Sequence, residues 1–154
     1  MKSGPRHFAD IAGLRAAVGE DLGTGEWLVV GQDRIDAFAE ATGDRQWIHV
    51  DAERARSGPY GATVAHGYLT VSLLPVLGRT AFTVGGARMS VNYGLDRVRF
   101  PEPVRSGARI RARAHLLSVE DVASGTRAVV RFTIEIEGRD RPACVADSIR
   151  LLVV

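Results

Sequence analysis

Alternating apolar and polar residues indicate β-strands throughout the C-terminal half of the chain. The clearest run spans 127–137, where every second residue is apolar: Ala128, Val130, Phe132, Ile134 and Ile136. A similar alternation covers 110–119, and the segments 89–100 and 143–154 also have strand composition. A period of two places the apolar side chains on one face of a half-buried sheet. We therefore expect about four consecutive strands, which favours an antiparallel sheet.

The N-terminal half has helical spacing instead. Apolar residues of 8–21 and 33–42 recur every three to four positions, which predicts two amphipathic helices. A short strand is expected at 26–30 between them. Gly43 is expected to end the second helix, because glycine readily adopts the left-handed conformation found there. Asp51 is expected to cap a further helical turn over 51–57.

One segment between these halves is apolar on nearly every face. A helix is expected to begin near Thr63–His66 and to run through Tyr68–Leu77. Its lack of a polar face predicts that it is buried, and Pro75 is expected to kink it or to mark its last turn. A sheet wrapped around this helix would bury both apolar surfaces. The predicted fold class is α+β, with an antiparallel sheet around a central apolar helix.

Composition and charge narrow the function classes. The 154 residues suffice for one domain, and 45% of them are apolar, as in globular proteins. No apolar run is long enough to span a membrane, and residues 1–10 lack the apolar stretch of a secretory signal, so we expect a cytoplasmic protein. Twenty basic and eighteen acidic residues are interspersed without a basic block, which does not support nucleic-acid binding. The single cysteine, Cys144, is expected to be buried in a strand.

Candidate chemistry lies in the run ATGDRQWIHVD, residues 41–51. Asp44 and His49 are five residues apart, across the expected helix end and a short loop. Across a loop the two side chains can converge on one water molecule, an arrangement suited to general acid–base catalysis. Spacing alone favours a simpler interpretation, a capping aspartate and a structural histidine.

Two further runs carry candidate binding residues. VAHGYLT, residues 64–70, lies at the expected start of the central helix, where free backbone N–H groups attract negative charge. Gly67 is therefore a candidate oxyanion donor, although tight packing explains a glycine equally well. His66 is a candidate for substrate contact, packing or support of the site. NYGLDRVRFPEPV, residues 92–104, includes Asn92, which either faces the pocket or makes a structural hydrogen bond.

Together these three runs resemble the MaoC-like dehydratase family of (R)-specific enoyl-CoA hydratases, in particular its branch named after nodulation protein NodN. The resemblance extends from about Glu26 to the C-terminus. It implies a single hot-dog domain over 1–154, with residues 1–25 as an N-terminal helical extension. It also implies a homodimer that binds an acyl-CoA substrate in fatty acid metabolism, needs no cofactor or metal, and does not associate with a membrane.

The resemblance also assigns roles to residues. It implies a hydro-lyase that adds water reversibly and syn to a trans-2-enoyl-CoA, giving an (R)-3-hydroxyacyl-CoA. Asp44 and His49 match the family's catalytic pair, and Gly67 matches its thioester-binding amide. Asn92 and His66 remain candidate substrate-binding residues. The pair does not reveal which of its members takes the proton from water.

Alternatives to this interpretation remain. Trp47–Ile48 stands where many family members have Pro–Leu, and Pro75 replaces a helix serine of some hydratases, so the shape of the acyl pocket is undefined. A hot-dog acyl-CoA thioesterase often uses a helix carboxylate, yet 64–77 contains no Asp or Glu. A non-catalytic acyl-binding subunit of a hetero-oligomeric dehydratase would have no chemical need for both members of the pair. A metal site built from Asp44, His49, Asp51 and His66 has no recognised ligand spacing.

Overall fold

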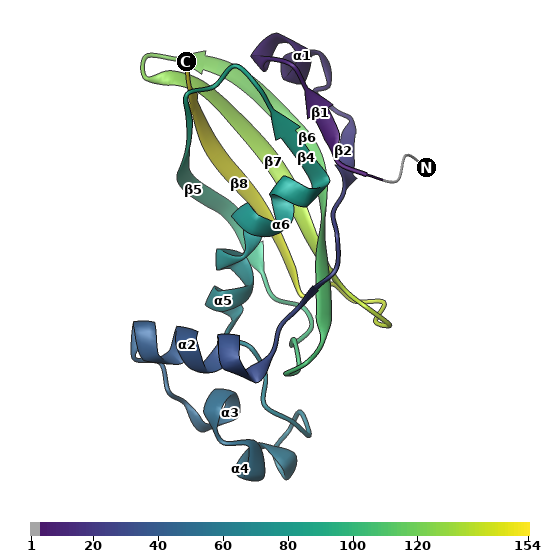
Figure 1. The fold of residues 1–154 in the computed structure, drawn as a ribbon, viewed down its shortest axis with the longest axis vertical. Coiled ribbons are helices and arrows are strands. Elements are labelled where there is room, and N and C mark those ends of the chain that lie inside the picture. Colours follow the sequence, from purple (N-terminus) through teal and green to yellow (C-terminus); the bar gives the residue numbers. More distant parts are fainter. Residues whose placement is uncertain (1–3) are drawn as a thin grey trace.

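The computed structural model describes residues 4–154, which form eight strands and six helices. The strands are β1 (Arg6–Phe8), β2 (Asp21–Thr24), β3 (Leu28–Val29), β4 (Phe82–Val84), β5 (Met89–Arg99), β6 (Arg109–Val122), β7 (Gly125–Ile136) and β8 (Cys144–Val153). The helices are α1 (Ile11–Ala16), α2 (Gln32–Thr42), α3 (Trp47–Val50), α4 (Ala52–Arg56), α5 (Gly67–Ser72) and α6 (Leu74–Ala81). Figure 1 shows α5 and α6 in front of the main sheet, with α2, α3 and α4 grouped below it.

The main sheet contains the four predicted C-terminal strands. Its order is β2-β6-β7-β8-β5, all antiparallel, with β3 pairing with β6 beside β2. The alternation read from the sequence is confirmed, because every second side chain of β7 from Thr126 to Ile136 is buried. The expected α+β class with an antiparallel sheet is confirmed as well. β5 lies at one edge of the sheet, with only β8 beside it.

The inner face of the sheet packs against the predicted central helix, which is divided in two. Leu69, Leu74 and Leu77 are almost fully buried in the same cluster as Phe132 of β7. α5 ends at Leu73, and Pro75 lies in the first turn of α6, where a missing N–H costs no helical hydrogen bond. The helix therefore continues beyond its proline to Ala81.

The expectation that the central helix is buried on nearly every face needs correction. Tyr68, in the first turn of α5, is 74% exposed, and Ser72, Pro75 and Arg79 are exposed as well. In a single chain the sheet covers only one side of the helix. The apolar residues of its other side therefore face outward.

The N-terminal segment is less helical than expected. Asp10 accepts a hydrogen bond from the Gly13 N–H and starts α1 at Ile11, so the helix is much shorter than 8–21. Phe8 instead belongs to β1, which pairs in parallel with β4, and β2 joins the main sheet through β6. Of the expected helical extension over 1–25, residues 4–25 are thus helical only at α1, and residues 1–3 lie outside the described residues. The strand expected at 26–30 is reduced to the two residues of β3.

Cys144 is buried at the start of β8, as predicted. Burial raises the pKa of its thiol to about 11, because the charged thiolate is poorly solvated in the core. Among residues 4–154, no helix has both the length and the apolar character needed to cross a bilayer.

Candidate active site

The backbone places Asp44 immediately after α2. Gly43 ends the helix in the left-handed conformation, with φ of 80°, and its N–H donates to the Ala39 carbonyl at 2.9 Å. This confirms the helix end predicted from the sequence. The Asp44 N–H donates to the hydroxyl of Thr42 at 3.4 Å, while the Asp44 side chain is exposed. Its carboxylate is thus presented at the surface by a turn with a defined geometry.

His49 lies on α3, a single helical turn in the segment expected to be a loop. Four residues are too few to show a helical period, so the sequence pattern missed it. The imidazole is 7% exposed, and its Nδ1 lies 2.7 Å from the Val64 carbonyl oxygen. A carbonyl only accepts hydrogen bonds, so Nδ1 carries the hydrogen and donates it. In the neutral ring, Nε2 therefore has a free lone pair.

Hydrogen bonds from two other segments hold α3 in place. The Gln32 side-chain amide donates to the His49 carbonyl at 2.7 Å, and the Thr63 hydroxyl donates to the Gln32 side-chain oxygen at 2.6 Å. The Val64 N–H also donates to the Ile48 carbonyl at 3.0 Å. Sequence reasoning missed these supporting groups, since a backbone carbonyl has no sequence signal and a lone Gln or Thr has many possible roles.

His66 contacts both members of the predicted pair. It is 2% exposed, its ring stacks on that of His49 with centroids 3.8 Å apart, and Phe38 packs on it with centroids 4.8 Å apart. Its Nε2 donates to the backbone carbonyl of Asp44 at 2.9 Å. Its Nδ1 is buried without a hydrogen-bond partner among residues 4–154. His66 thus ties the turn that carries Asp44 to the ring of His49.

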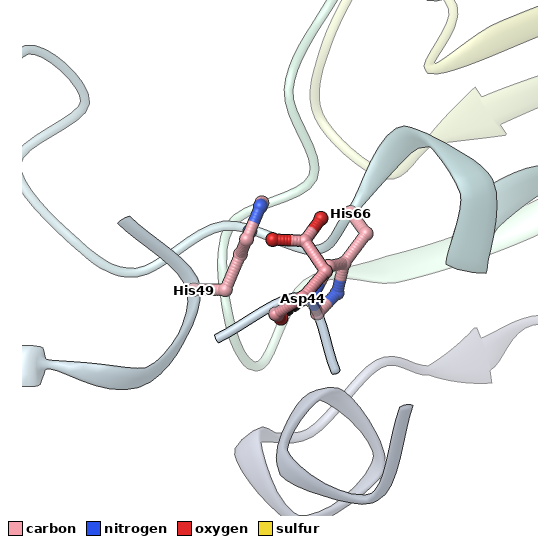
Figure 2. A group of neighbouring side chains, drawn as sticks. All are labelled: Asp44, His49 and His66. Carbon is pink, nitrogen blue, oxygen red and sulfur yellow. Dashed lines mark hydrogen bonds between the residues drawn. The ribbon is translucent and has the colours of Figure 1, made fainter. Parts of the chain in front are cut away.

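Three side chains from separate segments therefore converge, as Figure 2 shows for Asp44, His49 and His66. One polar atom from each lies within 4.8 Å of the other two, close enough to share one water molecule or one ion. A metal ion binds an imidazole nitrogen in the plane of the ring. The two rings are stacked at an interplanar angle of 22°, so their in-plane lone pairs run nearly parallel and do not converge on one ion. The arrangement suits a water molecule better than a metal ion.

Gly67 directly follows His66 and is the first residue of α5. A Cβ at this position would lie 2.9 Å from the Phe100 ring, so close packing requires a glycine here. Within residues 4–154 the Gly67 N–H donates to no protein acceptor. Gly67 thus has a packing role and also presents a free donor beside the three converging side chains.

Asn92 lies elsewhere. It is on β5, in register with Arg150 of β8, and it lines a cavity of about 450 Å³ between the central helix and the sheet. The same cavity is lined by residues of α5 and α6. None of the three converging side chains lines it. The structure therefore groups Asp44, His49, His66 and Gly67, and it places Asn92 in a neighbouring cavity.

Comparisons with known proteins agree with this fold. The MaoC-like domain model matches residues 14–138. A 3-hydroxyacyl-thioester dehydratase from Mycobacterium tuberculosis is 51% identical over 145 residues, covering 94% of this chain and 96% of that protein. Nodulation protein N of Rhizobium leguminosarum bv. viciae is 41% identical over 150 residues, covering 95% of this chain and 92% of that protein.

A solved structure supports the fold independently. The unliganded R-hydratase PhaJ1 from Pseudomonas aeruginosa superposes with a TM-score of 0.70 at 20% identity, covering 88% of this chain and 81% of that one. This likeness confirms the hot-dog fold. The family match and the high identity to two full-length relatives confirm the resemblance read from the three motifs. The chain belongs to the MaoC-like dehydratase family.

Proposed function

We propose that the chain is an (R)-specific enoyl-CoA hydratase, which adds water reversibly and syn to a trans-2-enoyl-CoA. The observation that carries the proposal is the orientation of His49. Its Nδ1–H is committed to the Val64 carbonyl, which leaves Nε2 as a hydrogen-bond acceptor, and a ring nitrogen of His49 lies within 4.8 Å of an Asp44 carboxylate oxygen. Two acceptors side by side suit a water molecule that donates both of its hydrogens.

In this proposal His49 and Asp44 hold the attacking water. With both hydrogens directed at the protein, an oxygen lone pair is free to attack the β-carbon of the substrate. His49 Nε2 takes one proton, and the imidazolium that forms is stabilised by the adjacent Asp44 carboxylate. The same proton then passes from His49 Nε2–H to the α-carbon, on the face to which the hydroxyl has added, which restores the neutral imidazole and gives syn addition. The (R) configuration is carried over from the activity named for the P. aeruginosa structure.

The thioester carbonyl needs a donor when negative charge develops on its oxygen. Gly67 supports this role, because its N–H has no protein acceptor within the described residues and it directly follows His66. A backbone N–H donor at such an oxygen typically contributes about 10²–10³ in rate. In this proposal the substrate brings its own coenzyme A, and the protein uses no further cofactor or metal.

The rival functions receive less support. Neither α5 nor α6 has a carboxylate, which a helix-based thioesterase or dehydratase site would use. A non-catalytic subunit would have no reason to direct a free imidazole nitrogen at a carboxylate. His66 fits a supporting role better than substrate contact, because its ring is covered by His49 and Phe38.

We also propose that two copies form a homodimer through β5. This strand has a free edge, and it exposes Met89, Val91, Tyr93 and Leu95 to between 39% and 70%. A long, apolar and unpaired edge is unusual in a monomer and is suited to pairing with another strand. Tyr68 and Phe100, which pack edge to face and are also exposed, extend the apolar surface beside it.

The test is an assay of the purified protein with trans-2-enoyl-CoA substrates of short, medium and long chain. We expect loss of the conjugated double bond and formation of the (R) product, identified with a stereospecific 3-hydroxyacyl-CoA dehydrogenase. Treatment with a chelator should leave the rate unchanged. Absence of hydration at every chain length would refute the proposal, and release of free thiol would indicate a thioesterase instead.

A further inference from the structure

Arg150 is a charged residue on the inner face of the sheet. It lies on β8, two residues from the buried Leu152, and its guanidinium reaches α6, which Figure 1 shows in front of β8. A Cβ at Gly78 of α6 would lie 3.0 Å from an Arg150 Nη, so the helix has a glycine where the arginine comes closest. The guanidinium also lies over the rings of Phe82 and Phe132, at 5.6 and 5.2 Å from their centroids.

Among the residues that the structure describes, no anionic group compensates this charge. Within residues 4–154, Nε of Arg150 is buried without a hydrogen-bond partner, and no carboxylate lies within salt-bridge distance of the guanidinium. Asp147 is on the same strand but binds Arg131 with both carboxylate oxygens, at 2.7 and 3.0 Å. Burial lowers the pKa of the Arg150 guanidinium, although an arginine remains charged in proteins. Arg150 is half-buried and lines a cavity, so an anionic ligand that enters the cavity can pair with its guanidinium.

The cavity beside Arg150 has room for such a partner. Its volume of about 450 Å³ is in the range of small-molecule sites. The helix side is mostly apolar, with Val71, Leu74 and Pro75. The sheet side contributes three polar residues, Ser148, Asn92 and Arg150, together with Gly94 and Leu95 of β5. An apolar wall with a few converging polar groups is typical of a site that orients a ligand by one end.

We infer that this cavity binds the far end of an acyl chain that carries a carboxylate, with Arg150 as the residue that recognises it. The inference rests on the proposed function, since it assigns a substrate class to the same site. Arg150 Nη donors bind the distal carboxylate, and Asn92 and Ser148 supply further hydrogen bonds. A guanidinium suits this task because its planar N–H groups match the two oxygens of a carboxylate.

The helix connects this cavity with the catalytic groups. Gly67 begins α5, Val71 is one turn further along, and Gly78 of α6 contacts Arg150. At 1.5 Å per residue, Gly78 lies at most about 16 Å beyond Gly67 along the helix. A thioester bound at the Gly67 N–H would thus reach Arg150 with a medium-length chain that follows α5 and α6. The apolar residues of this helix face suit the methylene part of the chain.

The experiment compares ω-carboxy and methyl-terminated trans-2-enoyl-CoA substrates of matched length. For the wild type we expect kcat/KM for the ω-carboxy series to exceed the methyl-terminated series by about ten- to a hundredfold at the best length, the usual range for one charged hydrogen bond. Arg150→Met should remove this preference while it retains hydration of a short methyl-terminated substrate. Arg150→Lys keeps the positive charge but lacks the planar guanidinium, so it should keep part of the preference for ω-carboxy substrates. Arg79→Met on the exposed side of α6 is the matched control and should behave as the wild type.

Two further measurements separate the possible failures. Calorimetric binding of saturated ω-carboxyacyl-CoA to each variant tests the Arg150 site even if no substrate is hydrated. The melting temperature of Arg150→Met should equal or exceed that of the wild type, since the substitution removes an unpaired charge. Equal or weaker binding of ω-carboxy chains by the wild type at every length would overturn the inference. So would loss of the dimer in Arg150→Met, which would show that Arg150 pairs with a second copy.

Discussion

At the residue scale, the roles proposed for Asp44 and His49 depend on a backbone carbonyl. The sequence predicted that the two side chains converge, and the resemblance assigned them to catalysis. Neither the sequence nor the resemblance showed which of the two side chains accepts a proton from water. The hydrogen bond from His49 Nδ1 to Val64 directs Nε2 outward and favours His49 as the base. No sequence pattern could reveal this, because every residue has a carbonyl and only the fold determines which one is within reach.

Substitution of either side chain should greatly reduce turnover. Asp44→Asn removes the carboxylate that stabilises an imidazolium, and His49→Gln removes the base, so each should lower kcat by about 10²–10⁴. Circular dichroism should show an intact fold, since Asp44 is exposed and glutamine can still donate to Val64. His7→Gln and Asp140→Asn at exposed positions provide matched controls. A near-normal kcat in either variant of the pair would contradict the roles proposed here.

At the scale of elements, the accuracy of the sequence predictions follows the length of each element. The strands β5 to β8 are long enough to show the alternation of buried and exposed positions, and their bounds were predicted closely. α3, with four residues, and β3, with two, are too short for a period, and tertiary hydrogen bonds define them. Pro75 was expected to kink the central helix or to mark its last turn. The helix is divided at Leu73, and Pro75 lies in the first turn of α6, which continues to Ala81.

The end of α2 provides a prediction at this scale. Gly43 adopts φ of 80°, and a Cβ there would meet no atom within 4 Å, so Gly43→Ala should be unfavourable through backbone conformation alone. We expect the free energy of unfolding to fall by about 1 kcal/mol, measured by urea denaturation. Because Asp44 follows directly, kcat should fall as well. Asparagine tolerates the left-handed conformation, so Gly43→Asn should lower the free energy of unfolding and kcat by less than Gly43→Ala does. Equal stability of the alanine variant and the wild type would show that this turn is not strained.

At the scale of the whole molecule, the two edges of the main sheet differ. At one edge, β2 and β3 are short and both pair with β6, and β2 also contacts α6. At the other edge, β5 is eleven residues long, unpaired on one side and largely apolar where it is exposed. The same side of the molecule exposes Tyr68 of the central helix, which the sequence predicted to be buried. A second copy at β5 would cover apolar surface that a single chain leaves in water.

The homodimer can be tested by placing charge on this edge. The wild type should have the mass of two chains in multi-angle light scattering. Val91→Lys combined with Tyr93→Lys should reduce it to one chain, because lysines on an edge strand disfavour strand pairing. Val29→Lys changes an apolar residue of similar exposure, 54%, on β3 and should leave the mass unchanged. A wild-type mass of one chain would refute the dimer.

The burial of Cys144 has a practical consequence for distinguishing the competing chemistries. It is the single thiol of the sequence, it is fully enclosed, and its pKa of about 11 leaves almost no thiolate near neutral pH. The native protein should therefore not react with thiol-reactive dyes. Any dye signal during an assay would then come from coenzyme A released by thioester cleavage. For the same reason, a spin label or fluorophore would react with a cysteine introduced on β5 and not with Cys144. The distance between two such labels would then report directly on how the two chains are arranged.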